Sequence, residues 1–531
     1  MTAQQPLPSK QADQPSSGGW GFSGSTPLAL LGKVIGLGLV AAITLWLAFP
    51  LIAQGSWLLL ALLLASAVGL FVVYLQPRRI PLKYLVPGTI FLVLFQVLPV
   101  LFTVSTAFTN FGDGHRGTKE EAITAIEGAS VRQVPGGVNY VLTLATKGDP
   151  ATGELLFLLV NPTTKETFVG DAKGLQPLTG ATVSSANRVT AAPGLTLLNA
   201  GQASARSAEI ASFTVPTANG AIRAQGLSRA YEGAKTRAYD ASCDCIKDTS
   251  SGTSWKADGS VGAFVSDTGD RLSQGWQVNV GFGNFAKIFG DQTLRTYFLG
   301  ILVWNFAFAL LVVFGTFAVG LAMAMALNHP RLKGLKFYRV LIVLPYAMPS
   351  FAMLLVWRDM FNQDFGLINT LTGLDVNWMG DQWAARFAVI LIQFWLGYPY
   401  MFLVCTGALQ SIPSDLVEAA SVDGASKWFS FRTVTLPLLF VATAPLLISS
   451  FAFNFNNYNA IAFTTEGGPF PPDSPQAGAT DLLISYTYRL AFGASGAQYG
   501  LAAAVSILIF LIVAGISIVS FRRTAVLEEI N

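Results

Sequence analysis

Charged side chains are scarce in this 531-residue chain: Asp, Glu, Lys and Arg together make up 12% of it, whereas 52% of its residues are hydrophobic. The mean hydropathy is +0.51. Soluble domains carry about 25% charged residues, so this composition excludes an ordinary soluble enzyme. The formal net charge is only +3, which gives no argument for nucleic-acid binding. The positions of the basic residues matter more than their sum.

Motifs for catalysis and nucleotide binding are also missing. The chain has no GxxxxGK[ST] phosphate-binding loop, so it does not bind ATP in the P-loop manner. Its two histidines are His115 and His329, and no Ser-His-Asp or zinc-ligand spacing occurs. We therefore expect no catalysis, no bound cofactor and no metal site in this polypeptide by itself.

Cysteine is rare as well, with three residues in all, too few for a disulfide framework. Cys405 lies in an apolar run, where we expect it to pack. Cys243 and Cys245 lie in the polar middle of the chain with one residue between them. A disulfide there would close a tight, strained ring, and a two-ligand metal site would be incomplete. We favour two free thiols, with an oxidised pair as the alternative.

Long apolar runs are what the chain has instead. Each is close to or above the roughly 20 residues needed to cross a hydrocarbon core. The sequence therefore predicts an α-helical polytopic membrane protein with eight transmembrane helices. The runs are 34–53, 57–76, 84–107, 296–327, 340–357, 387–409, 437–463 and 498–520, the fifth of which is short and carries two prolines.

None of these runs contains Asp, Glu, Lys, Arg or His. Ion- and proton-coupled carriers rely on ionisable groups inside the membrane, which are costly there and kept for function. The runs therefore have no obvious proton relay and no counter-charge for an ionic substrate. Their neutral hydrogen-bonding groups and aromatic rings suit an uncharged ligand rich in hydroxyl groups.

The basic residues predict the orientation. Alternating spans place four basic clusters on the same face, and the positive-inside rule makes that face cytoplasmic. Both termini are then cytoplasmic. The clusters are Arg78, Arg79 and Lys83; Arg331, Lys333, Lys336 and Arg339; Lys427 and Arg432; and Arg522 and Arg523.

Polar segments divide the chain into parts. Residues 1–32, rich in Gln, Pro, Ser and Gly, are expected to form a disordered cytoplasmic tail. Residues 108–285 contain strand-like stretches at 138–144 and 154–160, which predict a β-rich extracytoplasmic domain; a loosely ordered loop is the alternative. The segment 481–492 is amphipathic and is expected to rest on the outer interface. The predicted parts are the tail 1–32, three N-terminal transmembrane helices in 33–107, the extracytoplasmic domain 108–285, a core of five transmembrane helices in 286–521 and a cytoplasmic tail 522–531.

Residues 414–436, between the sixth and seventh runs, predict a helix–bend–helix elbow. Ser414 is a good N-cap, and Asp415 and Glu418 follow in the first turn, where negative charge suits the helix dipole. Gly424 falls where a left-handed residue would end the helix. The elbow would lie flat beside the bilayer as a docking surface; an ordinary amphipathic loop helix is the alternative.

Polar and aromatic side chains cluster near the outer half of the seventh run. Four of them recur at i, i+3, i+4 and i+7, one stripe of a helix, with a ring that can stack on a sugar and groups that can bond its hydroxyls. The alternative is interhelical hydrogen bonding, which we favour for Asn456 and Asn459 on the other face. The stripe consists of Ser450, Phe453, Asn454 and Asn457.

Glycine and proline interrupt two further runs, at 344–349 and 396–400. A mid-span proline frees a backbone carbonyl and loosens the helix, which is tolerated where the helix lines a cavity. We therefore choose Tyr346, Gly397 and Tyr400 as pocket residues, with a plain proline kink as the alternative.

The elbow carries a recognisable spacing. Glu418-Ala419-Ala420, three residues, Gly424, nine residues and then Val434-Thr435-Leu436-Pro437 resemble the EAA motif of membrane subunits of ABC importers. With the stretches LPYAMPSF, WLGYPYMF, SFAFNFNNY and TDLLISYTYRLAFG, the chain resembles the MalF-type permease subunits of maltose/maltodextrin importers, which are binding-protein-dependent transport system inner-membrane components. The similarity runs from the first apolar run to the C-terminus and is weak in 108–285.

This resemblance implies a type I ABC importer permease fold, the core 286–521 being the permease core, and transport of maltodextrins across the bacterial cytoplasmic (inner) membrane by alternating access. It implies a MalG-like second permease, a MalK-like ATPase dimer that holds ATP and Mg, and an extracytoplasmic sugar-binding protein. Gln393 stands where the family pattern has Asn, which affects the hydroxyl contact expected there. The implied sugar site is Tyr346, Gly397, Tyr400, Ser450, Phe453, Asn454 and Asn457. The implied coupling residues are Glu418, Ala419, Ala420, Asp423 and Gly424.

Three other hypotheses remain: a permease for another neutral oligosaccharide, a membrane receptor or scaffold that transports nothing, and an ion-coupled carrier. The elbow argues against the last two, and the uncharged runs argue against the carrier.

Overall fold

The computed structural model describes residues 27–53, 55–76, 80–133, 137–217, 220–327, 332–472, 476–493 and 496–529. It divides into two units, 1–102 and 103–531. Most of the predicted tail 1–32 lies outside the described residues, as do Arg78, Arg79, Arg331 and the side chain of Arg523.

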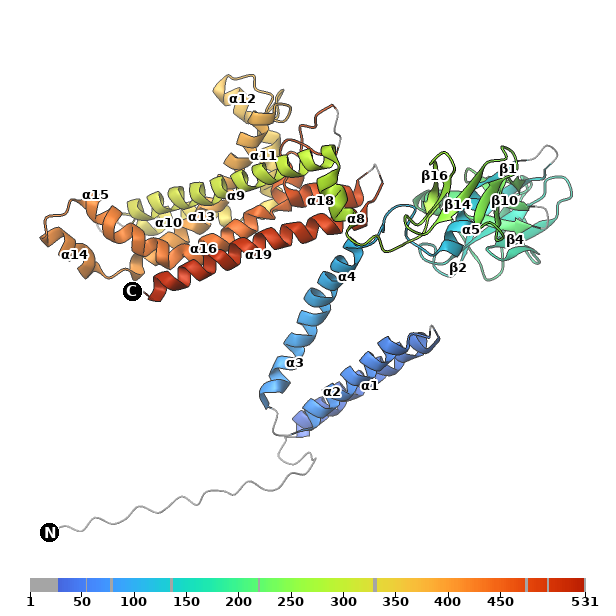
Figure 1. Ribbon diagram of the computed structural model, residues 1–531, viewed down its shortest axis with the longest axis horizontal. Coiled ribbons are helices and arrows are strands. Elements are labelled where there is room, and N and C mark those ends of the chain that lie inside the picture. The colour runs from blue at the N-terminus through green and yellow to red at the C-terminus, as the bar shows by residue number, and fades with distance from the viewer. Residues whose placement is uncertain are drawn as a thin grey trace, which may run out of the picture. The chain divides into compact units, whose positions relative to one another are not determined.

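The first unit is built from apolar helices. α1 (Pro27–Ala53) and α2 (Trp57–Leu75) form a helical hairpin, in which Gly55 takes the left-handed conformation at φ +67° (Figure 1). α3 (Ile80–Leu92) continues through the π-helical turn η1 (Val93–Val97) into α4 (Leu98–Ala107). Trp46 and Phe49 are each 73% exposed, as expected of side chains that face lipid.

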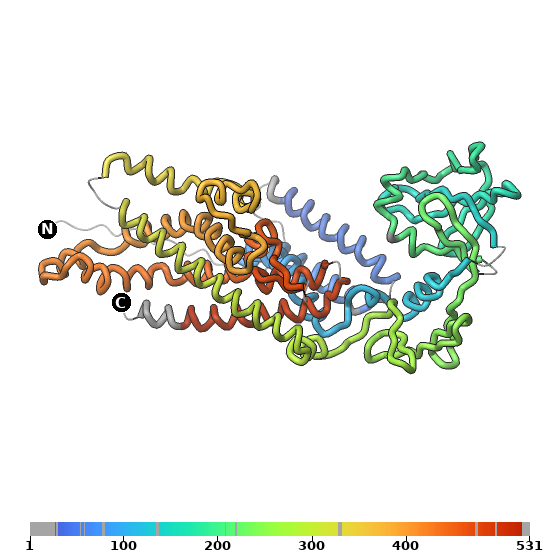
Figure 2. The backbone as a smooth tube through the Cα atoms, turned by 90° about the horizontal axis from the view of Figure 1, so that it is seen from above, coloured from blue at the N-terminus to red at the C-terminus, as the bar shows by residue number. Residues whose placement is uncertain are grey.

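A helical bundle forms the centre of the second unit. The long helices α9 (Gln292–Leu327), α13 (Gln382–Ser411), α16 (Leu436–Phe455) and α19 (Tyr499–Glu529) run side by side (Figures 1 and 2). A small residue lets two of them approach closely: a Cβ on Gly320 of α9 would lie 2.7 Å from the α13 backbone. Such glycine contacts are typical of helix packing in membranes.

The prediction of a polytopic α-helical membrane protein is confirmed. Six helices of the described part are long and apolar enough to cross a membrane, and Leu59–Leu75 is a shorter apolar helix. The fifth predicted run is a bent pair, in which α10 (Leu335–Val343) and the 3-10 turn η2 (Leu344–Ala347) meet α11 (Ser350–Met360) at 91°. Pro345 and Pro349 explain this break, because proline removes a backbone donor and clashes with the preceding turn.

The seventh run differs from the expected single helix. α16 ends at Phe455, and α17 (Tyr458–Ala462) begins after a two-residue break. Asn457 caps this second helix, because its side chain accepts a hydrogen bond from the Ala460 N–H at 3.1 Å. Asparagine competes with helical backbone bonding in this way, which is why an Asn-rich stretch ends a helix.

The polar middle of the chain is a β-rich domain, as predicted, and the loosely ordered loop is excluded. Its main sheet is antiparallel, with the order β5-β4-β3-β2-β11-β10-β9 and with β1 on β11 and β8 on β2. A second sheet has the order β12-β13-β14-β15-β16, and β6 pairs with β7. The strands are β1 (Val131–Gln133), β2 (Asn139–Lys147), β3 (Glu154–Val160), β4 (Thr167–Asp171), β5 (Gly174–Pro177), β6 (Thr182–Val183), β7 (Val189–Ala191), β8 (Thr196–Leu197), β9 (Thr214–Thr217), β10 (Gly220–Gln225), β11 (Arg229–Lys235), β12 (Arg237–Asp240), β13 (Cys245–Asp248), β14 (Ser254–Asp258), β15 (Ala263–Ser266) and β16 (Arg271–Gly275).

Both predicted strand stretches form the centre of the main sheet. β2 pairs with β3 from Val141↔Val160 to Lys147↔Glu154, and Leu142, Phe157 and Leu159 are fully buried on one face. The opposite face buries Ala145 and Leu158. A strand that is buried on both faces has a nearly continuous apolar sequence, as 154–160 does. The helices of this region are α5 (Lys119–Ala129), α6 (Ala200–Ala205) and α7 (Ser207–Ser212).

The preference for free thiols at Cys243 and Cys245 is wrong, because the two form a disulfide. Their Cα atoms are 5.2 Å apart, within the range that a disulfide spans. Asp244 between them is left-handed at φ +49°, which turns both cysteines to the same side. Its carboxylate accepts hydrogen bonds from Lys119 at 2.5 Å and Tyr239 at 2.7 Å. Both hydrogen bonds lower the pKa of Asp244, and the one from the Lys119 ammonium has the larger effect.

The expected position of the segment 481–492 at the outer interface stays a prediction, but its apolar face is buried by protein. Its helix α18 (Leu483–Phe492) packs against α19, and Leu483, Tyr486 and Leu490 are at most 4% exposed. The pattern was correctly amphipathic, but the apolar face is covered by protein. The remaining helices of this region are α8 (Gly283–Gly290) and α12 (Leu367–Thr372).

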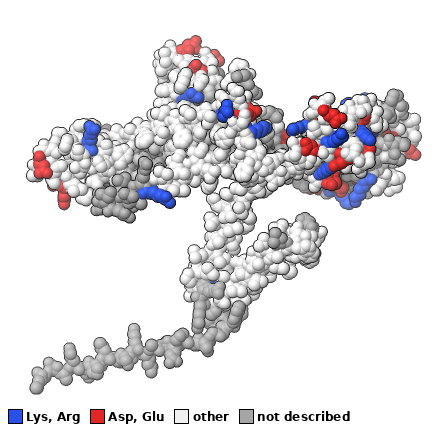
Figure 3. All heavy atoms as spheres, viewed as in Figure 1, with Lys and Arg blue, Asp and Glu red and all other residues white. Residues whose placement is uncertain are grey.

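Charged side chains are distributed unevenly between the β-rich domain and the helical bundle. Figure 3 shows acidic and basic side chains gathered over the β-rich domain and near the ends of the helices, whereas the described flank of the bundle on the face shown is uncharged. That distribution fits helix flanks that face hydrocarbon, where a charged side chain is costly.

Candidate functional site

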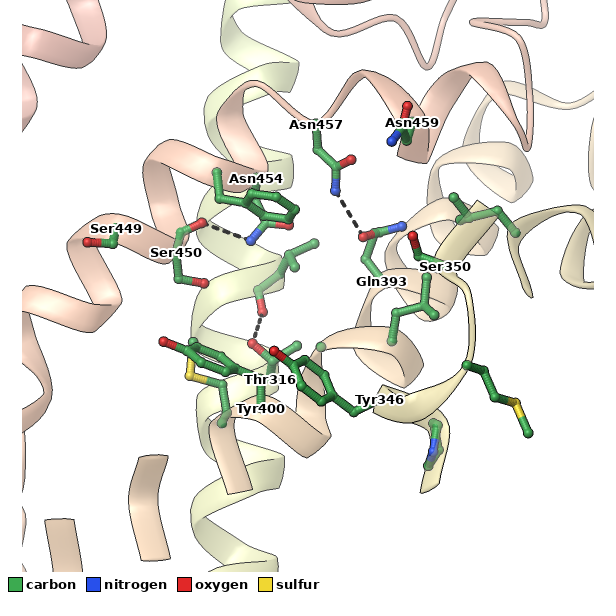
Figure 4. A pocket seen from close by; sticks show the side chains of 18 residues that line it. Thr316, Tyr346, Ser350, Gln393, Tyr400, Ser449, Ser450, Asn454, Asn457 and Asn459 are labelled. Atoms are coloured by element: carbon green, nitrogen blue, oxygen red, sulfur yellow. Dashed lines mark hydrogen bonds between the residues drawn. The ribbon is translucent and has the colours of Figure 1, made fainter. Parts of the chain in front are cut away.

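A pocket of about 570 Å³ lies in the bundle between α9, α13, α16, α17 and the η2–α11 break. This volume is within the ~300–1,000 Å³ typical of small-molecule sites. Figure 4 shows its polar side chains converging from these elements. The structure brings together here all seven residues predicted from the sequence: Tyr346, Gly397, Tyr400, Ser450, Phe453, Asn454 and Asn457.

The η2 break and α13 supply two tyrosines. The rings of Tyr346 and Tyr400 are stacked with centroids 6.4 Å apart, and Tyr346 is 58% exposed. Gly397 lies on the same stretch of α13, and a Cβ there would approach Thr316 Cγ2 to 2.8 Å. Glycine at this position therefore keeps the wall between α9 and α13 close-packed. α13 continues without interruption through Pro399, so the expectation of a loosened helix is wrong here and correct only at η2.

Amide groups form the opposite wall. Asn454 Nδ2 donates to the Ser450 carbonyl at 2.9 Å, and Asn457 Nδ2 donates to Gln393 Oε1 at 3.2 Å (Figure 4). These bonds fix the amide planes. Within the described part of the chain, Asn454 Oδ1 and Gln393 Nε2 make no hydrogen bond to protein, so they can serve an incoming hydroxyl.

Several lining residues escaped the sequence reasoning. Asn459 was assigned to interhelical bonding, but it lines the pocket because the break after Phe455 turns α17. Gln393, which the family resemblance had already placed at a hydroxyl contact, lines the pocket one turn before Gly397 on α13. No sequence signal pointed to Thr316 or Ser350, since their role depends on how α9 and α11 pack against α13. The polar lining residues beyond the predicted set are Thr316, Ser350, Gln393, Ser449 and Asn459.

The lining has no Asp, Glu, Lys, Arg or His. The described residues also contain no group of three or more His, Cys, Asp or Glu side chains that could hold a metal ion. What the pocket offers is exposed aromatic faces and neutral donors and acceptors; Phe453 is 68% exposed. An aromatic face carries partial negative charge, which attracts the C–H groups of a sugar ring.

The elbow is a second site. It consists of α14 (Ser414–Val422), α15 (Lys427–Ser430) and the π-helical turn η3 (Phe431–Thr435). The helix already includes Ser414, whose hydroxyl bonds Asp415 at 3.4 Å, so the prediction of Ser414 as N-cap is wrong by one residue. Gly424 is left-handed at φ +83° as predicted.

The Gly424 turn has the bonds of a complete Schellman motif. The Gly424 N–H donates to the Ser421 carbonyl at 3.1 Å, and the Ala425 N–H donates to the Ala420 carbonyl at 3.0 Å. Large apolar side chains remain exposed around it: Val422 is 88% exposed and Trp428 is 69% exposed. The elbow therefore exposes large apolar side chains beside charged ones, and nothing within the described residues covers them.

One helix connects the two sites. α15, η3 and α16 together form a continuous helix, Lys427–Phe455, of 29 residues. At 1.5 Å per residue it is about 44 Å long. Its first turns belong to the elbow and its last turns carry Ser450, Phe453 and Asn454. The elbow and one wall of the pocket are therefore parts of the same helix.

Two family models match parts of the chain, and one solved structure is similar to it over part of its length. Residues 90–173 match a family model described as the N-terminal of the TM subunit in PBP-dependent ABC transporters. Residues 316–525 match one described as binding-protein-dependent transport system inner membrane component. A bacterial ABC transporter involved in alginate import covers 46% of this chain and 83% of its own, with 22% identity and a TM-score of 0.39.

Two relatives align along nearly their full length. The maltose/maltodextrin transport system permease protein MalF of Escherichia coli (strain K12) is 34% identical over 505 residues, 92% of this chain and 95% of the relative. MalF of Yersinia pestis is 32% identical over 512 residues, 93% of this chain and 94% of the relative. Both are named as transport permeases rather than enzymes. With its uncharged pocket and apolar helices, this chain belongs to the MalF family of ABC importer permeases and is a multi-pass inner-membrane protein.

Proposed function

We propose that this chain carries maltose and maltodextrins across the inner membrane by alternating access, as one permease subunit of an ATP-driven importer. The observation that supports this most directly is the uncharged pocket joined by a single helix to an exposed elbow. The relatives named for maltose and maltodextrin transport favour these sugars among neutral ligands.

In this proposal, different pocket residues contact different parts of the sugar. Tyr346, Tyr400 and Phe453 provide ring faces for the apolar faces of the glucose units. Asn454 Oδ1 accepts a hydrogen bond from a sugar hydroxyl. The Gln393 amide, which stands where the family pattern has the shorter Asn, contacts the sugar from the opposite wall. Asn457 holds Gln393 in position through their hydrogen bond at 3.2 Å.

The energy source lies outside this chain. The proposed complex contains a second, MalG-like permease and a MalK-like ATPase dimer that binds ATP and Mg. The elbow, through Glu418, Ala419, Ala420, Asp423 and Gly424, would dock on the ATPase, because its apolar side chains are exposed. The elbow and both termini then face the cytoplasm. The β-rich domain would lie on the outer side, where a soluble sugar-binding protein delivers the substrate.

ATP-driven uptake by the reconstituted complex tests this function across a panel of maltose, longer maltodextrins, other neutral oligosaccharides and charged sugars. We expect uptake of the first two. Asn454→Leu should lower their uptake at least tenfold, because it removes a buried acceptor that the sugar needs. Asn456→Leu is the matched control, since Asn456 is exposed, bonds Ala452 and does not line the pocket. If the complex took up only another neutral sugar, that sugar would replace maltose and maltodextrins as the proposed substrate. If it took up no sugar at all, the proposal would be refuted.

A further inference from the structure

A second groove lies beside α17, the helix that also borders the pocket. Its volume is about 200 Å³, and its lining includes Tyr458, Glu466, Tyr488, Arg489 and Phe492. None of these residues belongs to the 570 Å³ pocket. Both sites meet at α17, where Tyr458 stands between two pocket residues, Asn457 and Asn459.

The helix α18 explains why aromatic rings are exposed here. Leu483, Tyr486 and Leu490 turn into the protein core and are at most 4% exposed. Tyr488 and Phe492, spaced at i and i+4, occupy the other face and are 50% and 63% exposed. Burial in the core therefore accounts for one face of α18, whereas the two rings on the other face contact neighbouring rings and remain half exposed or more.

These rings belong to a continuous row. Tyr458 and Tyr488 have centroids 4.9 Å apart, Tyr488 and Phe492 4.9 Å, and Phe492 and Tyr499 5.8 Å. The row ends at Phe111, 5.1 Å from Tyr499. It thus leads from the helix that borders the pocket to the segment that enters the β-rich domain.

Both ends of the row carry charge. Glu466 in the groove pairs with Arg358 at 2.5 Å, and both side chains are well exposed. At the far end the Arg116 guanidinium lies 5.4 Å from the Tyr499 ring and pairs with Asp113. Such groups are costly in hydrocarbon, so the row faces water rather than lipid tails. Flat rings beside water-accessible carboxylate and hydroxyl groups are suited to a hydroxyl-rich ligand.

We propose that the aromatic row Tyr458–Tyr488–Phe492–Tyr499 is an outer glucan subsite, which binds the part of a long maltodextrin that extends beyond the central pocket. This inference rests on the proposed function, since it concerns the same substrate at a second site. Each ring stacks on one face of a glucose unit, and Glu466 accepts hydrogen bonds from its hydroxyl groups. Maltose, which is short enough for the central pocket, does not need the row.

Competition between maltose and maltoheptaose for uptake by the reconstituted complex tests the subsite. In Tyr488→Leu and Phe492→Leu, we expect the apparent affinity for maltoheptaose to fall about fivefold, the effect of one lost stacking contact, with maltose uptake unchanged. Tyr488→Phe keeps the ring and should behave as wild type. Phe510→Leu, a 65% exposed aromatic on α19, controls for general loss of surface rings.

Other results would overturn the subsite. Equal loss for both sugars would mean that the rings only support packing, and no loss for either would mean that they bind no glucan. An effect that appears or disappears with the lipid headgroups of the vesicle would assign the row to the membrane surface. If the wild-type complex transports neither sugar, the proposed function itself fails. If it transports both and only Asn454→Leu is impaired, the subsite alone fails.

Discussion

Asp481 shows how one buried charge can organise a loop. Its side chain is 0% exposed, and its carboxylate accepts hydrogen bonds from Gly478 N–H at 2.7 Å, from Ser485 Oγ at 2.8 Å and from Arg489. Arg489 also donates to the carbonyl oxygens of Glu466 and Gln476. The pair thereby fixes both sides of the loop before α18 and holds the helix that carries the aromatic row.

We predict that Asp481→Asn destabilises the protein by about 3–5 kcal/mol, because Arg489 is left without its buried counter-charge. Thermal unfolding of the detergent-solubilised protein measures this effect. Asp267→Asn is the control, since Asp267 is 84% exposed and lies 3.6 Å from Lys256; its loss should cost at most about 1 kcal/mol. Similar stability losses in both variants would show that the buried pair has no special role.

The seven pocket residues could be predicted from the sequence, because amide side chains and aromatic rings stand out in apolar runs. The same reasoning failed at Asn459 and Thr316, whose positions depend on the helix break after Phe455 and on the packing of α9. It also failed at Cys243 and Cys245, because the left-handed backbone of Asp244 is not visible in the residue types.

Gly320 lets the backbones of helices α9 and α13 approach closely. A Cβ on Gly320 would lie 2.7 Å from Met401 C and Phe402 N. Because these are backbone atoms, neither can move away as a flexible side chain could. The two helices would have to separate, and both contribute residues to the pocket wall.

We therefore predict that Gly320→Ala destabilises the bundle by about 1–3 kcal/mol, the usual cost of overpacking. Gly300→Ala on the same helix has nothing within 4 Å of the new Cβ. That control should be neutral or slightly stabilising, because alanine is the better helix former. Thermal unfolding of the two variants side by side decides the matter; equal behaviour would rule out a close contact between the helices.

The elbow owes its bend to Gly424 at φ +83°. We predict that Gly424→Pro uncouples transport from ATP hydrolysis, because proline cannot adopt a positive φ. Gly424→Asn should retain most coupling, since asparagine tolerates the left-handed region. Glu418→Lys should also uncouple, because it reverses the charge of an exposed side chain on the proposed docking surface. The measurement is sugar-stimulated ATP hydrolysis by the assembled complex, and normal stimulation in Gly424→Pro or Glu418→Lys would refute a coupling role.

Elements were predicted well where one periodicity dominates. The strand 154–160 has the predicted ends, because an apolar run bounded by polar residues has little freedom. The seventh run was misjudged as one helix, since hydropathy does not register a break made by asparagine capping. The packing of α18 against α19 could not be predicted either, because an amphipathic pattern identifies a buried face but not whether protein or lipid covers it.

At the scale of the whole molecule, the basic residues and the helix that connects the elbow to the pocket predict the same orientation of the chain in the membrane. Figure 1 shows α14 and α15 at the end of the bundle remote from α8 and α18. The helix Lys427–Phe455 joins these ends and is long enough to cross a membrane, so we expect the elbow and the Asn-rich end of this helix to lie near opposite membrane surfaces. The basic residues near the elbow, Lys427 and Arg432, then predict that the elbow is cytoplasmic.

Single cysteines can test this orientation. Val422 on the elbow is 88% exposed and Asp267 in the β-rich domain is 84% exposed, so a thiol at either position would be accessible. The native cysteines give little background, because Cys405 is buried and Cys243 and Cys245 form a disulfide. We predict that a membrane-impermeant maleimide labels Asp267→Cys but not Val422→Cys in right-side-out vesicles, and the reverse in inverted vesicles. Labelling of Val422→Cys from the outside would separate the elbow from any cytoplasmic ATPase and would refute the proposed energy coupling.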